Sequence, residues 1–310
     1  MVNMVWGKYK CPSCGLGSEG TVRTFSSPTP AEDLDWEAVK SFFIGFRKKQ
    51  IFFSYLRCQN CSQLYCPEYF TERQLSDLYS DMPDNLIGQG EKAPRITQEG
   101  YASWASRKVP TASRYLELGP DIGLLASAIG KRIPLEIAAF VEPNLKVHQQ
   151  LLASLSDEIE KEISVSLDGI RGSNFDLVSL IHVLDHLLDP KKVLLTLHSI
   201  TDDKASILIV VHNEDSLLRK IVGHRWPPFC LQHPLLFKRS SLSKLLIETG
   251  WQIKDISSSR NYYFLPELAR ICCSVLGIPK YWTKAIPNLK VSIKTGNMIA
   301  LATKIPRSEI

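Results

Sequence analysis

The chain of 310 residues lacks the long apolar runs, signal segment and charge blocks that mark several specialised classes of protein. Its longest apolar stretch, residues 268–278, is shorter than the roughly 18 apolar residues of a membrane span and contains Arg270. No apolar signal core precedes Cys11, so we expect a cytoplasmic protein. No run of five like charges is present, which argues against a nucleic-acid-binding tail.

The composition is that of an ordinary globular protein. Hydrophobic residues make up 44% and charged residues 22% of the chain, whose length allows two domains or one large domain with an appendage. The net charge of +5 fits a mixed solvated surface better than a phosphate-binding face. Eight cysteines in a chain without a secretory signal favour metal ligands or free thiols over disulfides.

Four of the cysteines form two pairs with metal-binding spacing, Cys11 with Cys14 and Cys58 with Cys61. Each C-x-x-C pair can direct two thiolates at one tetrahedral ion, and two pairs complete a structural Zn²⁺ site. Short strands are expected beside the second pair. We therefore predict a zinc-ribbon module over residues 1–67, with a helical insertion at 35–48. The alternative is four buried cysteines that bind no metal.

Residues 68–110 are expected to connect this module to the rest of the chain. Thr71 and Gln74 have the spacing of a capping box, which predicts a short helix at 72–79. Residues 86–94 are polar and glycine-rich and predict a loop. A second helix is expected at 98–108, where Tyr101 either packs on the next domain or lies over a ligand as part of a lid.

From residue 111 onward the strand and helix patterns alternate. We expect strands at 114–118, 137–141, 164–167, 175–181 and 206–211, and helices at 124–131, 144–154, 190–200 and 240–249. Two more strands, at 251–258 and 298–304, flank a helical insertion at 265–276. Alternation at this rhythm predicts an α/β fold in which helices cover both faces of a largely parallel sheet.

The first of these strands runs into a glycine-containing turn, from Gly119 to Gly123, with a helix directly behind it. Glycine lets a ligand approach the backbone closely, and the start of the helix presents unpaired N–H groups to that ligand. The second strand leads into Glu142. An acidic residue about 20 positions beyond the glycines commonly binds the two hydroxyls of a ribose.

Several blocks, in the right order, resemble the class I S-adenosylmethionine-dependent methyltransferases. Residues 116–123 (LELGPDIG) match the first motif of that family at all but one position, and residues 141–143 (VEP) match the second. Residues 174–190, with the tail His182-x-x-Asp185-His186, look like the fourth-strand motif, and residues 232–251 resemble the late helix and sixth strand.

This resemblance covers roughly residues 101–304. It implies a seven-stranded Rossmann-like sheet with an antiparallel last strand, in a methyltransferase domain at 111–310. One subgroup of the family also carries an N-terminal zinc ribbon, which the two cysteine pairs resemble.

The resemblance implies which residues bind the methyl donor, S-adenosylmethionine. Glu117 would bind its ammonium group, Glu142 its ribose hydroxyls and Asp168 its adenine amino group. For these carboxylates the alternative is an ordinary position at a strand end or in a turn. The full implied set is Glu117, Gly119, Asp121, Gly123, Glu142, Asp168 and His182.

Asp121 departs from the family pattern, because it stands where the family has its middle glycine. Its negative charge would repel the pyrophosphate of a dinucleotide. S-adenosylmethionine has no phosphate and carries a positive sulfonium and a positive ammonium group. Asp121 therefore argues against NAD more than against the methyl donor.

Methyl transfer is an in-line displacement, so positioning supplies much of the rate, and a base is needed only if the acceptor must lose a proton. His182, His186 and His233 are the candidate catalytic residues, since histidine can accept a proton near neutral pH. For His186 the alternative is packing on the turn at Asp189. His212 is expected at a strand tip facing the same cleft.

These observations predict an S-adenosylmethionine-dependent methyltransferase acting on a small molecule such as a sugar, a sugar nucleotide or a secondary metabolite. Two alternatives are an RNA methyltransferase that grips RNA with the ribbon, and an inactive scaffold that keeps the fold. Nucleic acid is the less expected partner because the ribbon lacks clustered Lys and Arg with interleaved aromatic residues. The ribbon would position the acceptor or shape a homodimer.

Overall fold

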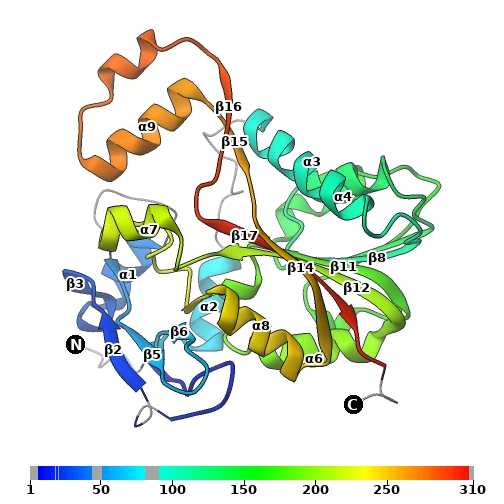
Figure 1. The fold of residues 1–310 in the computed structure, drawn as a ribbon, viewed down its shortest axis with the longest axis horizontal. Coiled ribbons are helices and arrows are strands. Elements are labelled where there is room, and N and C mark those ends of the chain that lie inside the picture. The colour runs from blue at the N-terminus through cyan, green and yellow to red at the C-terminus, as the bar shows by residue number, and fades with distance from the viewer. Residues whose placement is uncertain (1–5, 18, 20, 44–50, 81–90, 307–310) are drawn as a thin grey trace.

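A seven-stranded sheet forms the centre of the computed structural model, which describes residues 6–17, 19, 21–43, 51–80 and 91–306 (Figure 1). In sheet order the strands are β10 (Glu160–Ser164), β9 (Ile137–Val141), β8 (Arg114–Leu118), β11 (Phe175–Ile181), β12 (Thr201–His212), β17 (Asn297–Lys304) and β14 (Trp251–Ser258). The first five are parallel, and β17 runs antiparallel to both of its neighbours. This order confirms the predicted α/β fold.

Helices cover both faces of the sheet because alternate strand residues point to opposite sides. Tyr115 of β8 packs in one cluster with α3 (Lys92–Ser106), α4 (Leu124–Gly130) and α5 (His148–Leu152). Leu116 and Leu118 pack in the other with α6 (Pro190–Ile200) and α8 (Arg239–Glu248). The chain turns to opposite sides after β8 and β11, and ligands bind at such a crevice beyond the carboxyl ends of the strands.

Several predicted elements differ from the structure. The third strand is Glu160–Ser164 rather than 164–167. It is a polar edge strand, and Val165 lies beyond it, 52% exposed. Helix α3 begins at Lys92, so residues 92–94 are not a loop; Pro94 is tolerated in the first turn, where a backbone N–H has no partner. Residues 86–90 lie outside the described residues.

The helix expected at 144–154 is divided into η3 (Leu145–Val147) and α5. Two further short 3-10 turns, η4 (Leu167–Gly169) and η5 (Leu184–His186), follow β10 and β11. Because η5 comes directly after β11, it brings Asp185 and His186 to the carboxyl edge of the sheet.

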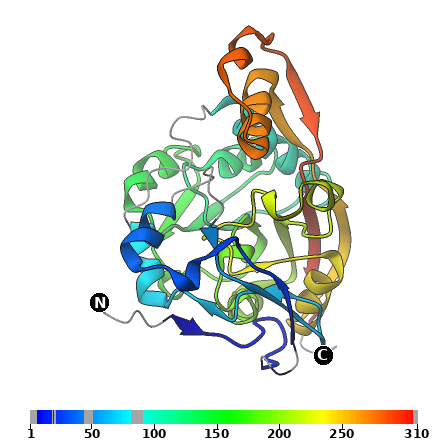
Figure 2. The same cartoon turned by 90° about the vertical axis from the view of Figure 1, so that its left-hand side faces the viewer.

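An arm, defined as residues 259–296, projects from the body of the molecule (Figures 1 and 2). It contains β15 (Asn261–Phe264), α9 (Leu265–Leu276), η7 (Tyr281–Ala285) and β16 (Lys290–Ile293), and β15 pairs with β16. The two ends of the arm meet where the N–H of Ser259 donates to the carbonyl of Asn297 at 3.0 Å. None of the helices in the described part of the chain is long and apolar enough to cross a membrane.

The N-terminal module shares a four-stranded sheet with a later part of the chain. The order is β13 (Leu235–Leu236), β6 (Leu64–Tyr65), β5 (Tyr55–Cys58) and β2 (Thr21–Phe25). The other elements of this part of the chain are β1 (Gly7–Lys8), β3 (Thr29–Pro30), η2 (Ala31–Asp33), α1 (Trp36–Phe42), β4 (Ile51–Phe52), β7 (Glu68–Tyr69) and α2 (Glu72–Ser80). Two further elements, α7 (Leu217–Val222) and η6 (Gly223–Arg225), follow β12. The predicted insertion helix is thus seen at 36–42, and residues 44–48 lie outside the described residues.

Buried side chains of the module also bind the backbone of the segment 226–237. The hydroxyl of Tyr55 donates to the carbonyl of His233 at 2.6 Å, and Nε2 of Gln63 donates to the carbonyl of Leu236 at 2.7 Å. Both side chains are fully buried, so these bonds satisfy groups that water cannot reach. The module therefore fixes the course of this segment.

A two-point ion pair adds to the same junction. Nη1 and Nη2 of Arg57 lie 2.8 and 3.1 Å from the two carboxylate oxygens of Glu214, and Glu214 is 4% exposed. Arg57 lies on β5, and Glu214 follows β12. A paired carboxylate of this kind is tolerated in the interior only with its partner.

We expect Arg57→Met to lower the free energy of unfolding by about 3 kcal/mol, since it leaves the buried Glu214 carboxylate unpaired. The double variant Arg57→Met with Glu214→Leu should recover most of that loss, because neither charge then remains. Urea denaturation of the wild type, the two single variants and the double variant measures these values. If the double variant lost the sum of the free energies lost by the two single variants, the pair would have no role in joining the module.

Candidate functional site

The turn between β8 and α4 is built on three backbone positions with positive φ. They are Gly119 at +63°, Asp121 at +52° and Gly123 at +78°. Aspartate is one of the few residues enriched in this left-handed region, so it can replace glycine at the middle position without losing the turn. A Cβ at Gly123 would lie 2.4 Å from Oγ of Ser154, which explains glycine at that end.

Glu117 is buried at the carboxyl end of β8. It is 2% exposed, and its Oε2 accepts a hydrogen bond from the Tyr115 hydroxyl at 2.9 Å. Burial, with Glu142 nearby, raises the pKa of Glu117 to about 8 although the Tyr115 hydrogen bond opposes this. A positive group next to Glu117 would stabilise its charged form and reverse the shift.

Glu142, directly after β9, ties the turn to the neighbouring strand. Its Oε2 accepts the backbone N–H of Asp121 at 2.9 Å, and its Oε1 accepts that of Asn144 at 2.8 Å. Each carboxylate oxygen has further lone pairs that can accept ligand hydroxyls. Glu142 is 7% exposed, so its position is fixed before any ligand arrives.

Asp168 lies apart from these buried carboxylates. It is exposed, in the turn η4 after the edge strand β10. Since β10, β9 and β8 are neighbours, the turn lies at the same edge of the sheet as Glu142 and Glu117. A ligand that contacted all three carboxylates would extend across the carboxyl ends of these strands.

Histidines lie at the carboxyl ends of the next two strands. His182 follows β11 in a left-handed conformation with φ of +55°, and His212 is the last residue of β12. Their ring centroids are 4.6 Å apart. Burial, with His212 beside it, lowers the pKa of His182 to about 3, so the His182 ring is neutral. A non-glycine residue at positive φ after a strand is a strained position, of the kind found at functional sites.

Asp185 holds His212 in place. Its Oδ2 lies 2.6 Å from Nδ1 of His212 and also accepts the backbone N–H of His212 at 3.2 Å. Asp185 is fully buried, and although burial opposes ionisation, His212 holds the pKa of Asp185 well below its usual range. The second oxygen, Oδ1, has no hydrogen-bond partner among the described residues.

His186 and His233 lie next to this pair, with ring centroids 4.6 Å apart. Nδ1 of His186 is 3.0 Å from the Tyr79 hydroxyl. Nδ1 of His233 is 2.7 Å from the carbonyl of Pro228 and 3.2 Å from Sγ of Cys230. Burial, with His233 beside it, lowers the pKa of His186 to about 3. Burial also acts to lower the pKa of His233, but Cys230 outweighs it and raises that pKa to about 9.

A cavity of about 1220 Å³ opens beside His182 and His212, under the arm. Of the residues predicted to bind the donor or to act in catalysis, only His182 lines it. His186 and His233 are not among its lining residues. The apolar part of the lining includes Leu218, Val222, Trp226, Pro227, Pro228, Phe264, Leu268, Ile271 and Ile293.

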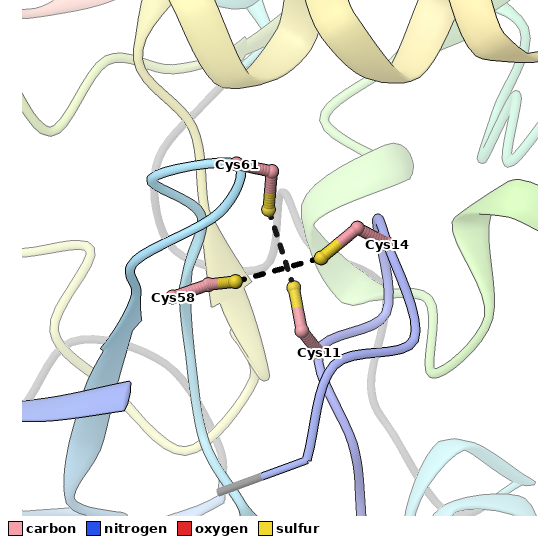
Figure 3. Close-up of side chains that lie close together, drawn as sticks. All are labelled: Cys11, Cys14, Cys58 and Cys61. Carbon is pink, nitrogen blue, oxygen red and sulfur yellow. Dashed lines mark hydrogen bonds between the residues drawn. The ribbon is translucent and has the colours of Figure 1, made fainter. Parts of the chain in front are cut away.

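The four predicted cysteines come together in the N-terminal module (Figure 3). The Sγ atoms of Cys11 and Cys61 are 3.4 Å apart and those of Cys14 and Cys58 are 3.5 Å apart, near the roughly 3.8 Å separation around a tetrahedral Zn²⁺. Both cysteine pairs adopt the same kind of turn. The N–H of Gly15 donates to the carbonyl of Cys11, and the N–H of Ser62 donates to the carbonyl of Cys58. The donor set fits a structural zinc ion.

Sequence reasoning did not assign roles to Tyr115, Asp185 and Asn297. Asp185 was visible within the motif His182-x-x-Asp185-His186, but its contact with His212 depends on how β11 and β12 pair. Asn297 lies 115 positions from His182, and its Nδ2 is 3.3 Å from Nε2 of that ring. No local pattern could have joined residues so far apart.

Comparison with known proteins gives one family match and many similar folds. The sequence profile described as "Methyltransferase domain" matches residues 70–256. No curated protein sequence matches the chain.

Two of the similar solved structures have low sequence identity to this chain. A chain from the complex between the Haloferax volcanii Trm112 methyltransferase activator and a protein assigned as a methyltransferase has a TM-score of 0.52 and 11% identity, covering 72% of this chain and 97% of that one. The N-methyltransferase NodS from Bradyrhizobium japonicum WM9, in complex with S-adenosyl-L-homocysteine, has a TM-score of 0.48 and 9% identity, covering 74% and 97%. At such low identity, the first match shows a shared fold and no more.

We expect Gly119→Ala to destabilise the protein by about 2–4 kcal/mol, for two reasons. The backbone of residue 119 has positive φ, and an added Cβ would lie 2.6 Å from Cγ2 of Val183. Gly277→Ala is the matched control. It has φ of +73° with no atom within 4 Å of the added Cβ, so it should cost only about 1–2 kcal/mol. Urea denaturation measures both; equal losses would show that Val183 does not constrain the turn.

Proposed function

This chain belongs to the methyltransferase-domain family, and we propose that it transfers a methyl group from S-adenosylmethionine to a small molecule held beside His182 and His212. The observation that carries the proposal is the cavity of about 1220 Å³ that meets the carboxyl ends of β11 and β12. This volume is somewhat above the roughly 300–1,000 Å³ of typical small-molecule sites, so it can hold a sizeable small molecule.

On this proposal the three carboxylates bind the methyl donor. Glu117 binds the ammonium group, and Asp168 accepts a hydrogen bond from the adenine amino group. Glu142 accepts hydrogen bonds from the ribose hydroxyls through the lone pairs that its bonds to the backbone N–H groups of Asp121 and Asn144 do not use. The burial of Glu117 and Glu142 supports the first two assignments, since a buried carboxylate interacts strongly with a positive or donor group. Gly119 and Gly123 allow the backbone to approach, and Asp121 adds negative charge suited to a sulfonium.

His212 is the proposed general base, with Asp185 as its positioning partner. Nδ1 of His212 donates to Asp185, which leaves Nε2 as the nitrogen that can take a proton from an acceptor in the cavity. His182 lies between this ring and the glycine turn and shapes the passage for the methyl group. Since His186 and His233 do not line the cavity, we assign them no proton transfer.

The lining of the cavity suggests the chemistry of the acceptor. Its walls are mainly apolar and aromatic, which favours a molecule with an apolar body, such as a secondary metabolite, over a bare sugar. Four basic residues and two acidic ones also line it: Lys92, Arg95, Arg270 and Lys280, with Glu91 and Glu267. This balance favours an acceptor that also carries a negative charge.

We also propose that Cys11, Cys14, Cys58 and Cys61 bind one structural Zn²⁺. The ion would fix two knuckles that lie next to β5 and β6, and through the shared sheet it would fix the segment 226–237. Trp226 of that segment lines the cavity. The module would thus shape the acceptor site indirectly, by holding the segment that supplies Trp226.

We expect the affinity for S-adenosylhomocysteine to rise with pH, by up to about tenfold per unit below pH 8, and to level off above it. In the free protein Glu117 is protonated below its pKa of about 8, and pairing with the ligand ammonium requires the charged form, so binding releases a proton. Calorimetric titration from pH 6 to 9 measures this. Glu117→Gln should bind more weakly and without that slope; a wild-type affinity independent of pH contradicts the role of Glu117.

We expect His212→Asn to lower the rate of methyl transfer by about 10²–10⁴-fold while S-adenosylhomocysteine affinity changes less than about twofold, because the ring serves the acceptor and not the donor. The assay follows labelled methyl groups from S-adenosylmethionine into a whole cell extract, which is then separated into low-molecular-weight and macromolecular fractions. His224→Gln, an exposed histidine, is the control. Label found only in ribonuclease-sensitive material, or no donor binding at all, would overturn the small-molecule proposal.

A further inference from the structure

A second group of metal-type ligands lies in the core of the molecule, separate from the cysteines. It consists of Asp185, His186 and His233, which each place a donor atom within 4.8 Å of the other two. Asp185 and His186 come from η5, and His233 comes from the segment that the N-terminal module holds. Asp185 is 0% exposed and His233 is 6% exposed, so bulk water does not surround the group.

The hydrogen bonds around the two rings leave the same nitrogen available on each. Nδ1 of His233 is 2.7 Å from the Pro228 carbonyl, which can only accept, so Nδ1 carries a proton. Nδ1 of His186 is engaged by the Tyr79 hydroxyl at 3.0 Å. A metal-bound histidine typically donates its other ring N–H to a carbonyl or another oxygen, which orients the ring. Both rings match that arrangement with Nε2 as the ligand.

The carboxylate of Asp185 has one oxygen in use and one without a partner. Oδ2 binds the backbone and ring of His212, whereas Oδ1 is buried and lacks a hydrogen bond within the described residues. An unpartnered buried oxygen on a charged group is costly, and a cation bound to Oδ1 would remove that cost.

We propose that Asp185 Oδ1, His186 Nε2 and His233 Nε2 bind a divalent transition-metal ion, either Zn²⁺ or Fe²⁺. Two histidine nitrogens and one carboxylate oxygen form a donor set that suits both ions and leaves further coordination positions open. Metal–ligand bonds of about 2.1 Å place tetrahedral donors about 3.4 Å apart. One donor atom of each of the three side chains already lies within 4.8 Å of those of the other two, so small side-chain rotations are enough to bring the donors around one ion.

The ion would have a positioning role that goes beyond the proposed transfer reaction. It would link η5 to the segment 226–237, and it would fix Asp185, whose other oxygen holds His212 at the cavity. The proposal concerns metal binding and does not depend on the identity of the acceptor.

The experiment counts metal ions in the full-length protein after chelation and reconstitution with Zn²⁺, or with Fe²⁺ under anaerobic conditions. We expect two ions per chain in the wild type. Cys58→Ser should lose only the thiolate-bound ion, and His233→Gln only the other. His224→Gln, an exposed histidine outside the group, should keep both. Substitution with Co²⁺ identifies the sites, since only the cysteine site gives a thiolate charge-transfer band.

Tyr79→Phe tests metal binding without removing a proposed ligand or a buried ring, because it removes only the hydroxyl next to His186. It should weaken binding at the second site by about 10–100-fold, and Cys58→Ser should not. One ion per chain in the wild type, lost completely in Cys58→Ser, would overturn the proposal. A proton on His233 would then be the charge that compensates Asp185. Neither result alters the test of donor binding or methyl transfer described above.

Discussion

The pairing of β6 with β13 is the constraint on which the site depends, because it joins the N-terminal cysteine module to the segment 226–237. Only two residues pair on each strand, yet the Tyr55 and Gln63 hydrogen bonds and the Arg57–Glu214 ion pair reinforce the junction from three directions. The same segment supplies Trp226 to the cavity and His233 to the buried histidine group. The cysteine module and the acceptor side of the molecule therefore share one segment of the chain.

The carboxyl edge of the sheet is divided by charge type. Buried carboxyl groups lie at the ends of β8 and β9, and imidazoles lie at the ends of β11 and β12, so acidic groups are concentrated where the donor would lie and the rings of His182 and His212 face the cavity. His182, at positive φ, stands at the border. This division arises from the topology: the chain leaves β8 and β11 in opposite directions, and each half of the edge receives a different set of strand ends.

Features with a local cause could be predicted from the sequence. The strand β8, the turn with Gly119 and Gly123 and the helix α4 follow one another directly, and the spacing within each cysteine pair is short. The assembled sites could not be predicted in the same way. β13 is too short to give a strand signal, and its partner β6 lies far away in the chain. The unpaired oxygen of Asp185 appears only when β11, β12 and the segment 226–237 are placed together.

The arm is a single continuous stretch, and its two ends are hydrogen-bonded neighbours at Ser259 and Asn297. It covers the cavity but contributes none of the carboxylates proposed to bind the donor. Evolution can therefore exchange this stretch for another of different length and composition without disturbing the sheet beneath it. Such replacement would diversify the molecules accepted by an otherwise unchanged catalytic body, and the same two positions are natural points at which to graft chimaeras.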